Sequence, residues 1–163
     1  MTRARVVATP AGPLRLVATT AGLQRLEWLT GAPSPPAGAT PSLLLDRAQA
    51  ALTAYFADPA RPLPCLPLAP VAATAFRWRV WRAMAAIPAG EVRTYGELAA
   101  GLGTSPRAVG NAAGANPWPI LVPCHRVVAS GGLGGYLGAT AGTGPAIKGW
   151  LLAHEGHPAG LGG

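Results

Sequence analysis

One thiol in the chain has the neighbours that a nucleophile requires. Cys124 lies between Pro123 and His125 in the segment NPWPILVPCHRVV (116–128). A free cysteine has a pKa of about 8.5, so little of it is thiolate at neutral pH and a nucleophilic role needs a base. His125 can take the proton, directly or through a water, if a turn at Pro123 brings both side chains together, because neighbours in a strand face opposite sides. A buried structural cysteine is the more common alternative after an apolar run.

The base in turn needs an acceptor that orients it, and the chain has only six acidic residues. The segment AIKGWLLAHEG (146–156) predicts a helix with an apolar face that ends at Glu155. Cys124, His125 and Glu155 would then form a triad assembled from two segments. A metal site is disfavoured, because the cysteines and histidines show neither C-x-x-C nor H-E-x-x-H spacing.

The segment before the thiol predicts a helix-turn-helix. Thr94 and Glu97 form a T-x-x-E capping box that starts a short helix, and Gly101 and Gly103 are expected to break it. Ser105 caps the next helix, which has a proline at its first position. This second helix consists almost entirely of small residues, so it offers little to base edges but can approach a narrow surface closely. Tight packing against a neighbouring helix is the alternative.

The remaining elements are a hairpin and two helices. Alternating apolar residues predict a β-hairpin over 13–29, and helical spacing predicts helices over 42–58 and 74–87. Residues 30–42 are expected to form a Pro/Gly loop, and the proline-rich segment 60–70 a linker between two lobes.

The chain is therefore predicted to be an α/β protein of two lobes. A small N-terminal lobe (1–68) would hold an antiparallel β-sheet and a helix, and a mostly helical C-terminal lobe (69–163) the helix-turn-helix. Hydrophobic residues make up 50% of the chain, which suffices for a core.

Net charge and cysteine content indicate what kind of molecule the protein binds and in which compartment it works. The net charge of +7 and the pI of about 10.8 favour an anionic partner such as nucleic acid. Arg77, Arg79 and Arg82 would lie on a solvated helix face, with phosphate contact as the alternative. Neither a signal peptide nor an apolar run of membrane-spanning length occurs, so we expect a cytoplasmic protein in which Cys65 and Cys124 are free thiols.

From about residue 70 to 156 the chain resembles the O6-alkylguanine-DNA alkyltransferases, also called methylated-DNA–protein-cysteine methyltransferases. The motifs that carry the resemblance follow the family's order: IPAGEVRTYGELA, RAVGNA, NPWPILVPCHRVV, GGLGGYLG and IKGWLLAHEG. The resemblance implies direct repair of O6-alkylguanine, and of O4-alkylthymine, in double-stranded DNA. The alkyl group would pass once to Cys124, with no cofactor and no metal.

The resemblance also implies roles for five catalytic residues. Cys124 attacks the alkyl carbon, His125 is its water-linked base, and Glu155 orients that base. Asn116 is the hinge that orients the cysteine segment, and Tyr95 donates a hydrogen bond to the extruded base.

The family's DNA contacts are made by the helix-turn-helix in the minor groove. Arg107 enters the base stack in place of the extruded base, and Tyr136 belongs to a loop that closes over the lesion. Lys148 matches a lysine near the pocket without a defined role. The DNA-binding residues expected on this basis are Thr94, Arg107, Ala108, Gly110, Arg126 and Tyr136.

Two features depart from the family's pattern. Leu137 stands where the family often has a small or hydroxylic residue, and the segment GATAGTGPAIKG (138–149) is long. Both are expected to reshape the pocket and to alter its tolerance of bulky alkyl groups.

Three other functions are kept as alternatives. A lesion-binding relative would recognise the base without transfer, which Cys124 disfavours. A thiol hydrolase would need an oxyanion hole, and a regulatory helix-turn-helix would need a richer second helix. The protein is expected to be a bacterial monomer that binds no membrane, and clustering along DNA stays open.

Overall fold

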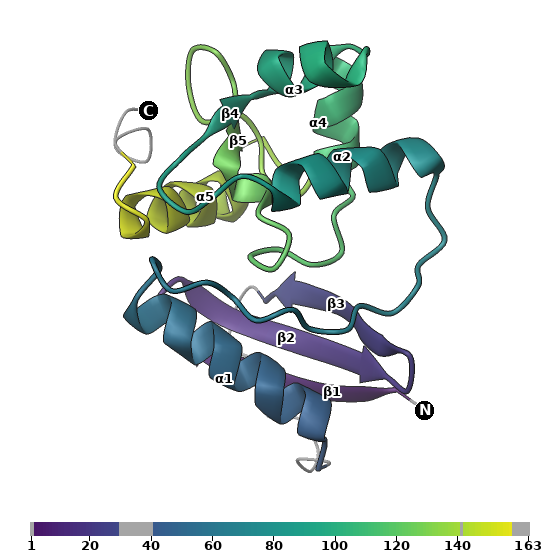
Figure 1. Cartoon of the computed structure of the whole chain (residues 1–163). Helices are drawn as coiled ribbons and strands as arrows, with labels where there is room; N and C mark the ends of the chain where they lie inside the picture. The colour runs from purple at the N-terminus through teal and green to yellow at the C-terminus, as the bar shows by residue number, and fades with distance from the viewer. Residues whose placement is uncertain (1, 30–40, 141, 158–163) are drawn as a thin grey trace. The chain divides into compact units, whose positions relative to one another are not determined.

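The computed structural model describes residues 2–29, 41–140 and 142–157, and most of the expected loop at 30–42 lies outside them. The chain divides into two compact units, Met1–Ala72 and Ala73–Gly163. As predicted, it is an α/β protein with an antiparallel sheet and a helix in the first unit and mostly helices in the second (Figure 1). No helix in the described ranges combines the length and the apolar composition needed to cross a bilayer.

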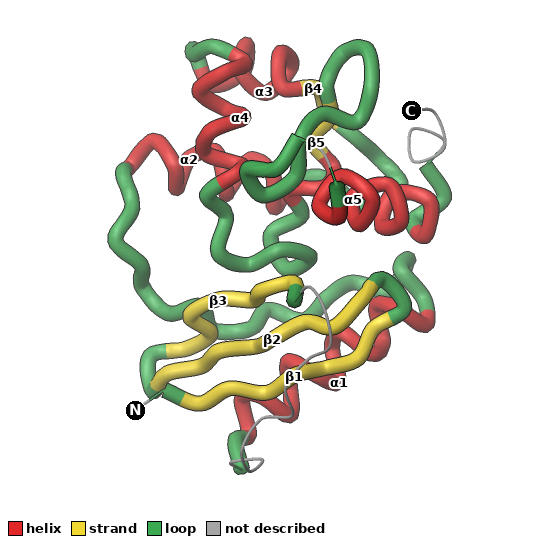
Figure 2. The backbone as a smooth tube through the Cα atoms, turned by 180° about the vertical axis from the view of Figure 1, so that it is seen from behind, coloured by secondary structure: helices red, strands yellow, loops and turns green. Residues whose placement is uncertain are grey.

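The first unit is a three-stranded antiparallel sheet in the order β1-β2-β3, covered on one face by a helix (Figures 1 and 2). The predicted hairpin over 13–29 is present as β2 (Gly12–Thr19) and β3 (Gly22–Trp28), and the predicted helix as α1 (Leu43–Ala57). The sequence did not reveal β1 (Arg3–Thr9), because Val7 alone among its residues is buried and the strand has no clear alternation.

The proline-rich segment 60–70 is more than a linker. Its second half runs beside β3, where the Leu23 amide donates to the Pro67 carbonyl (2.9 Å) and the Ala69 amide donates to the Leu23 carbonyl (2.8 Å). Leu66 and Ala69 are buried, so these residues belong to the core of the first unit.

The second unit carries the thiol and is built from short elements (Figure 1). Strands β4 and β5 form a parallel pair, in which Arg93 pairs with Val127 and Thr94 with Val128. The elements are α2 (Ala75–Ala85), β4 (Arg93–Thr94), α3 (Tyr95–Leu102), α4 (Pro106–Gly114), the 3-10 helix η1 (Cys124–Arg126), β5 (Val127–Val128) and α5 (Thr143–His154).

Helix α2 packs through an aromatic cluster that the sequence pattern did not single out. The rings of Trp78, Trp81 and Trp118 lie 5.0 to 5.7 Å apart, and Trp81 Nε1 donates to the Ala112 carbonyl on α4 (2.8 Å). Phe76, near the start of α2, is only half-buried. The three arginines of α2 are exposed, in agreement with a solvated face.

The helix-turn-helix is formed by α3 and α4, with the capping predicted from the sequence. The Thr94 hydroxyl accepts a hydrogen bond from the Glu97 amide, and the Glu97 carboxylate accepts one from the Thr94 amide. The two bonds complete the capping box. Gly103 ends α3 in the left-handed conformation (φ 69°), whereas Gly101 continues the helix and does not break it. Ser105 caps α4 through the Ala108 amide (3.2 Å).

Candidate active site and DNA-binding face

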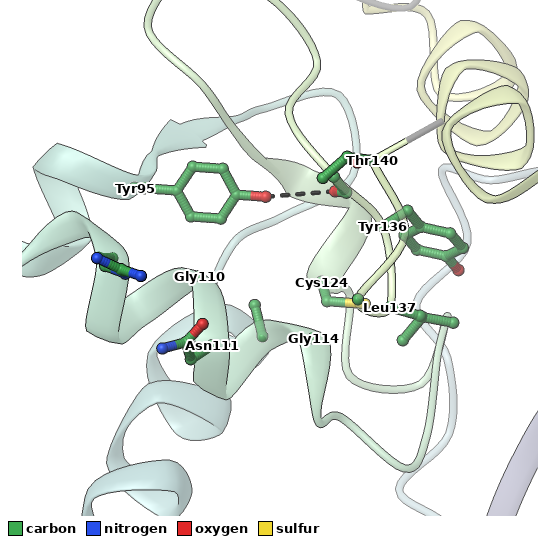
Figure 3. A pocket seen from close by; sticks show the side chains of 12 residues that line it. Tyr95, Gly110, Asn111, Gly114, Cys124, Tyr136, Leu137 and Thr140 are labelled. Carbon is green, nitrogen blue, oxygen red and sulfur yellow. Dashed lines mark hydrogen bonds between the residues drawn. The ribbon is translucent and has the colours of Figure 1, made fainter. Parts of the chain in front are cut away.

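A pocket of about 310 Å³ in the second unit has Cys124 in its wall (Figure 3). One side is α4, from Arg107 to Gly114, and another is the loop 135–140. Tyr95, at the start of α3, closes the pocket between them. The pocket therefore joins the helix-turn-helix to the thiol.

The thiol is positioned by a turn of η1. Cys124 is only 4% exposed. Burial raises the pKa of the Cys124 thiol to about 11, against the lowering effects of a hydrogen bond from the Asn116 side chain and of the charge of Lys148. The sulfur is therefore a neutral thiol at neutral pH, and a base must remove its proton when it reacts.

The neighbouring histidine has the arrangement of such a base. His125 is fully buried, and its Nε2 lies 2.8 Å from Oε2 of Glu155. Burial lowers the pKa of His125 more than the Glu155 carboxylate raises it, so the ring is neutral. The carboxylate accepts the Nε2 proton, which leaves Nδ1 as the acceptor. Nδ1 is buried and has no hydrogen-bond partner in the described part of the chain.

Arg126, which we expected among the DNA-binding residues, has its guanidinium turned toward the interior of the protein. Nε and Nη2 donate to the two oxygens of Glu155 (2.9 and 2.8 Å), and Nη1 donates to the Ile87 carbonyl (2.7 Å). The side chain is 10% exposed and the Glu155 side chain is fully buried. Arg126 therefore fixes the carboxylate that orients His125.

Asn116 organises the chain that leads to the thiol. Its Nδ2 donates to the Val122 carbonyl (2.8 Å) and its Oδ1 accepts from the Trp118 amide (3.0 Å). The residues between them turn sharply, and Ile120 has a positive φ of 74°. Since Val122 lies two residues before Cys124, the side-chain amide of Asn116 fixes the position of the backbone just before the turn that carries the thiol.

Lys148, which the sequence left without a role, is fully buried beside the pocket. Its Nζ donates to the Val127 carbonyl (2.6 Å), the Gly135 carbonyl (2.8 Å) and the Tyr95 hydroxyl (3.3 Å). Burial lowers its pKa to about 8, although the charge of the Cys124 thiolate opposes this. Lys148 thus connects β5, the pocket loop and α3.

The loop 135–140 forms a tight wall. The Tyr95 hydroxyl donates to the Gly135 carbonyl (3.3 Å), the dashed line in Figure 3, and Tyr136 is 3% exposed. Leu137 has a positive φ of 50°, which is unusual for a branched residue. Thr140, which the loop shares with the long segment 138–149, also lines the pocket, as Leu137 does, so both departures from the family's pattern reach the site.

The expected DNA-binding residues fall on or near the exposed side of the helix-turn-helix, apart from Arg126 and the buried Tyr136 of the loop. Arg107 is exposed, and Ala108 and Gly110 are half-buried. Thr94 is half-buried, and its hydroxyl serves as a helix cap.

Comparison with known proteins identifies the family. Residues 75–157 match the model of the "6-O-methylguanine DNA methyltransferase, DNA binding domain". The methylated-DNA–protein-cysteine methyltransferase of Mus musculus is 38% identical over 175 residues, which cover 95% of this chain and 82% of the mouse protein. This chain belongs to the O6-methylguanine-DNA methyltransferase family.

Solved structures of the methyltransferase family match almost the whole chain. The Mycobacterium tuberculosis O6-methylguanine methyltransferase has a TM-score of 0.76 at 36% identity and covers 95% of this chain and 93% of its own. The same organism's OGT in complex with DNA has a TM-score of 0.76 at 39% identity, with coverages of 98% and 97%. The fold that the sequence resemblance implied is therefore confirmed.

Asn111 and Thr140 are pocket residues that sequence reasoning missed in this methyltransferase-family chain. Asn111 could have been found, because it lies four residues after Arg107 on the same predicted helix. No comparable signal existed for Thr140, whose position depends on the path of a loop. In the described ranges, no group of three or more His, Cys, Asp and Glu side chains could hold a metal ion.

Proposed function

We propose that this protein repairs O6-alkylguanine in double-stranded DNA by transferring the alkyl group once to Cys124. The observation that carries the proposal is a thiol in the wall of a pocket that is also lined by the second helix of a helix-turn-helix. A base inside a duplex is out of reach of a thiol in a pocket, so the alkylated base must leave the stack. O4-alkylthymine is the second lesion that we include.

The transfer uses the neutral thiol and the neutral histidine. As Cys124 Sγ attacks the alkyl carbon, its proton passes to Nδ1 of His125, directly or through a water. The imidazolium that forms is stabilised by Glu155, whose carboxylate is 2.8 Å from Nε2. The new S–C bond forms as the C–O bond breaks, and guanine departs with the electron pair.

The leaving base is assisted by hydrogen bonds, because attack at a saturated carbon forms no tetrahedral oxyanion. Tyr95 is the donor that we assign to the base, so its hydroxyl proton turns from the Gly135 carbonyl to the base when the base is bound. The Lys148 ammonium, which donates to the same hydroxyl (3.3 Å), favours that donation. The product is a thioether without a good leaving group, so each molecule acts once.

Arg107 is the residue that we assign to the gap left by the extruded base, and the small residues of α4 permit a close approach to the minor groove. The net charge of +7 supports binding to the phosphate backbone. We further propose that the protein acts as a monomer.

Intact mass spectrometry tests the proposal. The protein is incubated with an excess of duplex oligonucleotide that contains one O6-methylguanine. We expect a single added methyl group, located on Cys124 by peptide mapping, and never more than one per protein. Loss of methyl from DNA in excess of the protein would indicate a hydrolase. Binding without a mass change would indicate a lesion-binding protein.

Two variants separate chemistry from binding. Cys124→Ala should bind the methylated duplex but take no methyl. Arg107→Ala should bind it more weakly, or extrude the base more slowly, with the thiol intact. Equal affinity and equal transfer rate in the Arg107 variant would refute its role in the stack.

A further inference from the structure

The exposed face of α4 carries one polar side chain whose function the mechanism does not explain. Only Arg107 and Asn111 among the residues of α4 have polar side-chain groups. They are four residues apart, so they lie on the same face of the helix, and both are exposed and line the pocket. The side chain of Asn111 makes no hydrogen bond to the part of the chain that the structure describes.

The rest of that face cannot read bases. The buried side of α4 is formed by Val109, Ala112 and Ala113, and the other side carries Ala108 and glycines. Gly110, Asn111 and Gly114 follow one another along the helix beside the pocket, with Gly114 nearest to Cys124 (Figure 3). A duplex that lies along this face of α4 while it presents a base to the pocket passes over Asn111.

We propose that Asn111 reads a base pair next to the extruded nucleotide from the minor groove and favours a guanine there. This inference rests on the proposed function. Asparagine is one of the side chains with which proteins read the minor groove, and a helix face of glycine and alanine suits a close approach to it. The Asn111 Nδ2 can donate to the acceptors that every base pair shows in this groove, so it does not discriminate. Its Oδ1 can accept from the N2 amino group, which only guanine provides.

Removal of that amino group tests the inference. Single-turnover methyl transfer is measured on duplexes whose pair on either side of the lesion is G·C or inosine·C, since inosine lacks the amino group. At one of the two flanks the wild-type protein should react about three- to tenfold faster beside guanine, the range for one hydrogen bond. In Asn111→Ala this ratio should fall by about three- to tenfold, to the value that pair strength alone sets, since the variant cannot form that bond.

The variant also corrects for the weaker inosine·C pair, because any effect of pair strength persists in Asn111→Ala. An equal guanine-to-inosine ratio in both proteins at both flanks would overturn the inference. A wild-type rate that depends on 7-deazaguanine, which alters only the major-groove edge, would overturn the choice of groove. If the wild-type protein took no methyl from any duplex, the proposed function itself would fail. One methyl per molecule of the variant at the end point shows that it is folded.

Discussion

The ammonium nitrogen of Lys148 lies 3.3 Å from the hydroxyl oxygen of Tyr95 and 5.4 Å from the centre of its ring. Few lysines are fully buried, and within the described part of the chain the hydrogen bonds of this one go to two carbonyls and the phenol, with no carboxylate among them. The cation is retained at a cost in stability, since burial lowers its pKa to about 8 from an ordinary value of 10.5. An apolar side chain at this position could not make the three hydrogen bonds that join β5, the 135–140 loop and α3.

The first prediction is that the loss of stability caused by burying the charged Lys148 disappears at high pH, where the side chain is neutral. A lysine with a lowered folded pKa binds fewer protons than the unfolded chain between the two pKa values, so stability rises with pH there. The pH dependence of urea unfolding should differ between Cys124→Ala and Cys124→Ala/Lys148→Met. The lysine-containing protein should gain about 3 kcal/mol relative to its partner by about pH 10.5.

The Cys124→Ala background is needed because the thiol has the opposite effect. The pKa of Cys124 is higher in the folded protein than in the unfolded chain. Its contribution to stability is therefore fully present below the pKa of the unfolded chain and is lost as the pH rises toward about 11. The Cys124 charge also raises the pKa of Lys148, so the gain begins at or below pH 8 without it. Parallel pH profiles for the two variants would contradict a buried lysine.

The second prediction concerns the reactivity of the thiol. Because burial raises the pKa of Cys124 to about 11, its alkylation by iodoacetamide should increase about tenfold per pH unit from pH 7 to pH 10. The rate is measured in Cys65→Ser, which removes the exposed second thiol. The same protein in urea should show a plateau above its ordinary pKa, and a plateau below pH 9.5 in the folded protein would contradict the raised value.

The third prediction compares two glycines of α4. A Cβ at Gly114 would lie 3.2 Å from the Gly138 nitrogen in the pocket loop, whereas a Cβ at Gly110 would meet only Tyr95 ring carbons at 3.9 Å. Gly110→Ala should stabilise the protein by about 0.5–1 kcal/mol through helix propensity. Gly114→Ala should be destabilising by about 1 kcal/mol or more, since the backbone of the loop must move. Urea unfolding of both variants checks this, and equal stabilities would show that the loop yields without cost.

The fourth prediction tests the ion pair behind the histidine. Glu155→Gln leaves the Arg126 guanidinium buried without its carboxylate and should cost about 3–5 kcal/mol. Glu155→Gln/Arg126→Met should recover part of this loss, because no buried charge remains. Methyl transfer should stay slow in both, since Glu155 no longer stabilises the imidazolium. A double variant no more stable than Glu155→Gln would mean that Arg126 contributes mainly through packing.

The sequence predicted local structure where one residue type determines it. Thr94, Ser105 and Gly103 define the ends of α3 and α4 through hydrogen bonds and backbone conformation that depend on neighbours in sequence. The prediction that Gly101 ends the helix was wrong, because α3 continues to Leu102. A glycine inside a helix lowers stability by only about 1 kcal/mol relative to alanine, which the rest of the helix can offset.

Features that depend on distant partners could not be predicted in this way. The inward direction of Arg126 follows from the position of Glu155, 29 residues later. The role of Lys148 requires that β5, the 135–140 loop and α3 meet at one point. Strand β1 forms because β2 offers an edge, with little help from its own pattern.

The tryptophan cluster beneath α4 has a practical consequence. Indole emission responds to the polarity and hydrogen bonding of its surroundings, and the Trp81 indole donates directly to a carbonyl of the helix proposed to meet DNA. Trp78 and Trp118 lie within energy-transfer range of it. The protein therefore carries its own optical reporter of that helix, and stopped-flow fluorescence without any added dye can time the docking of DNA and the events that follow.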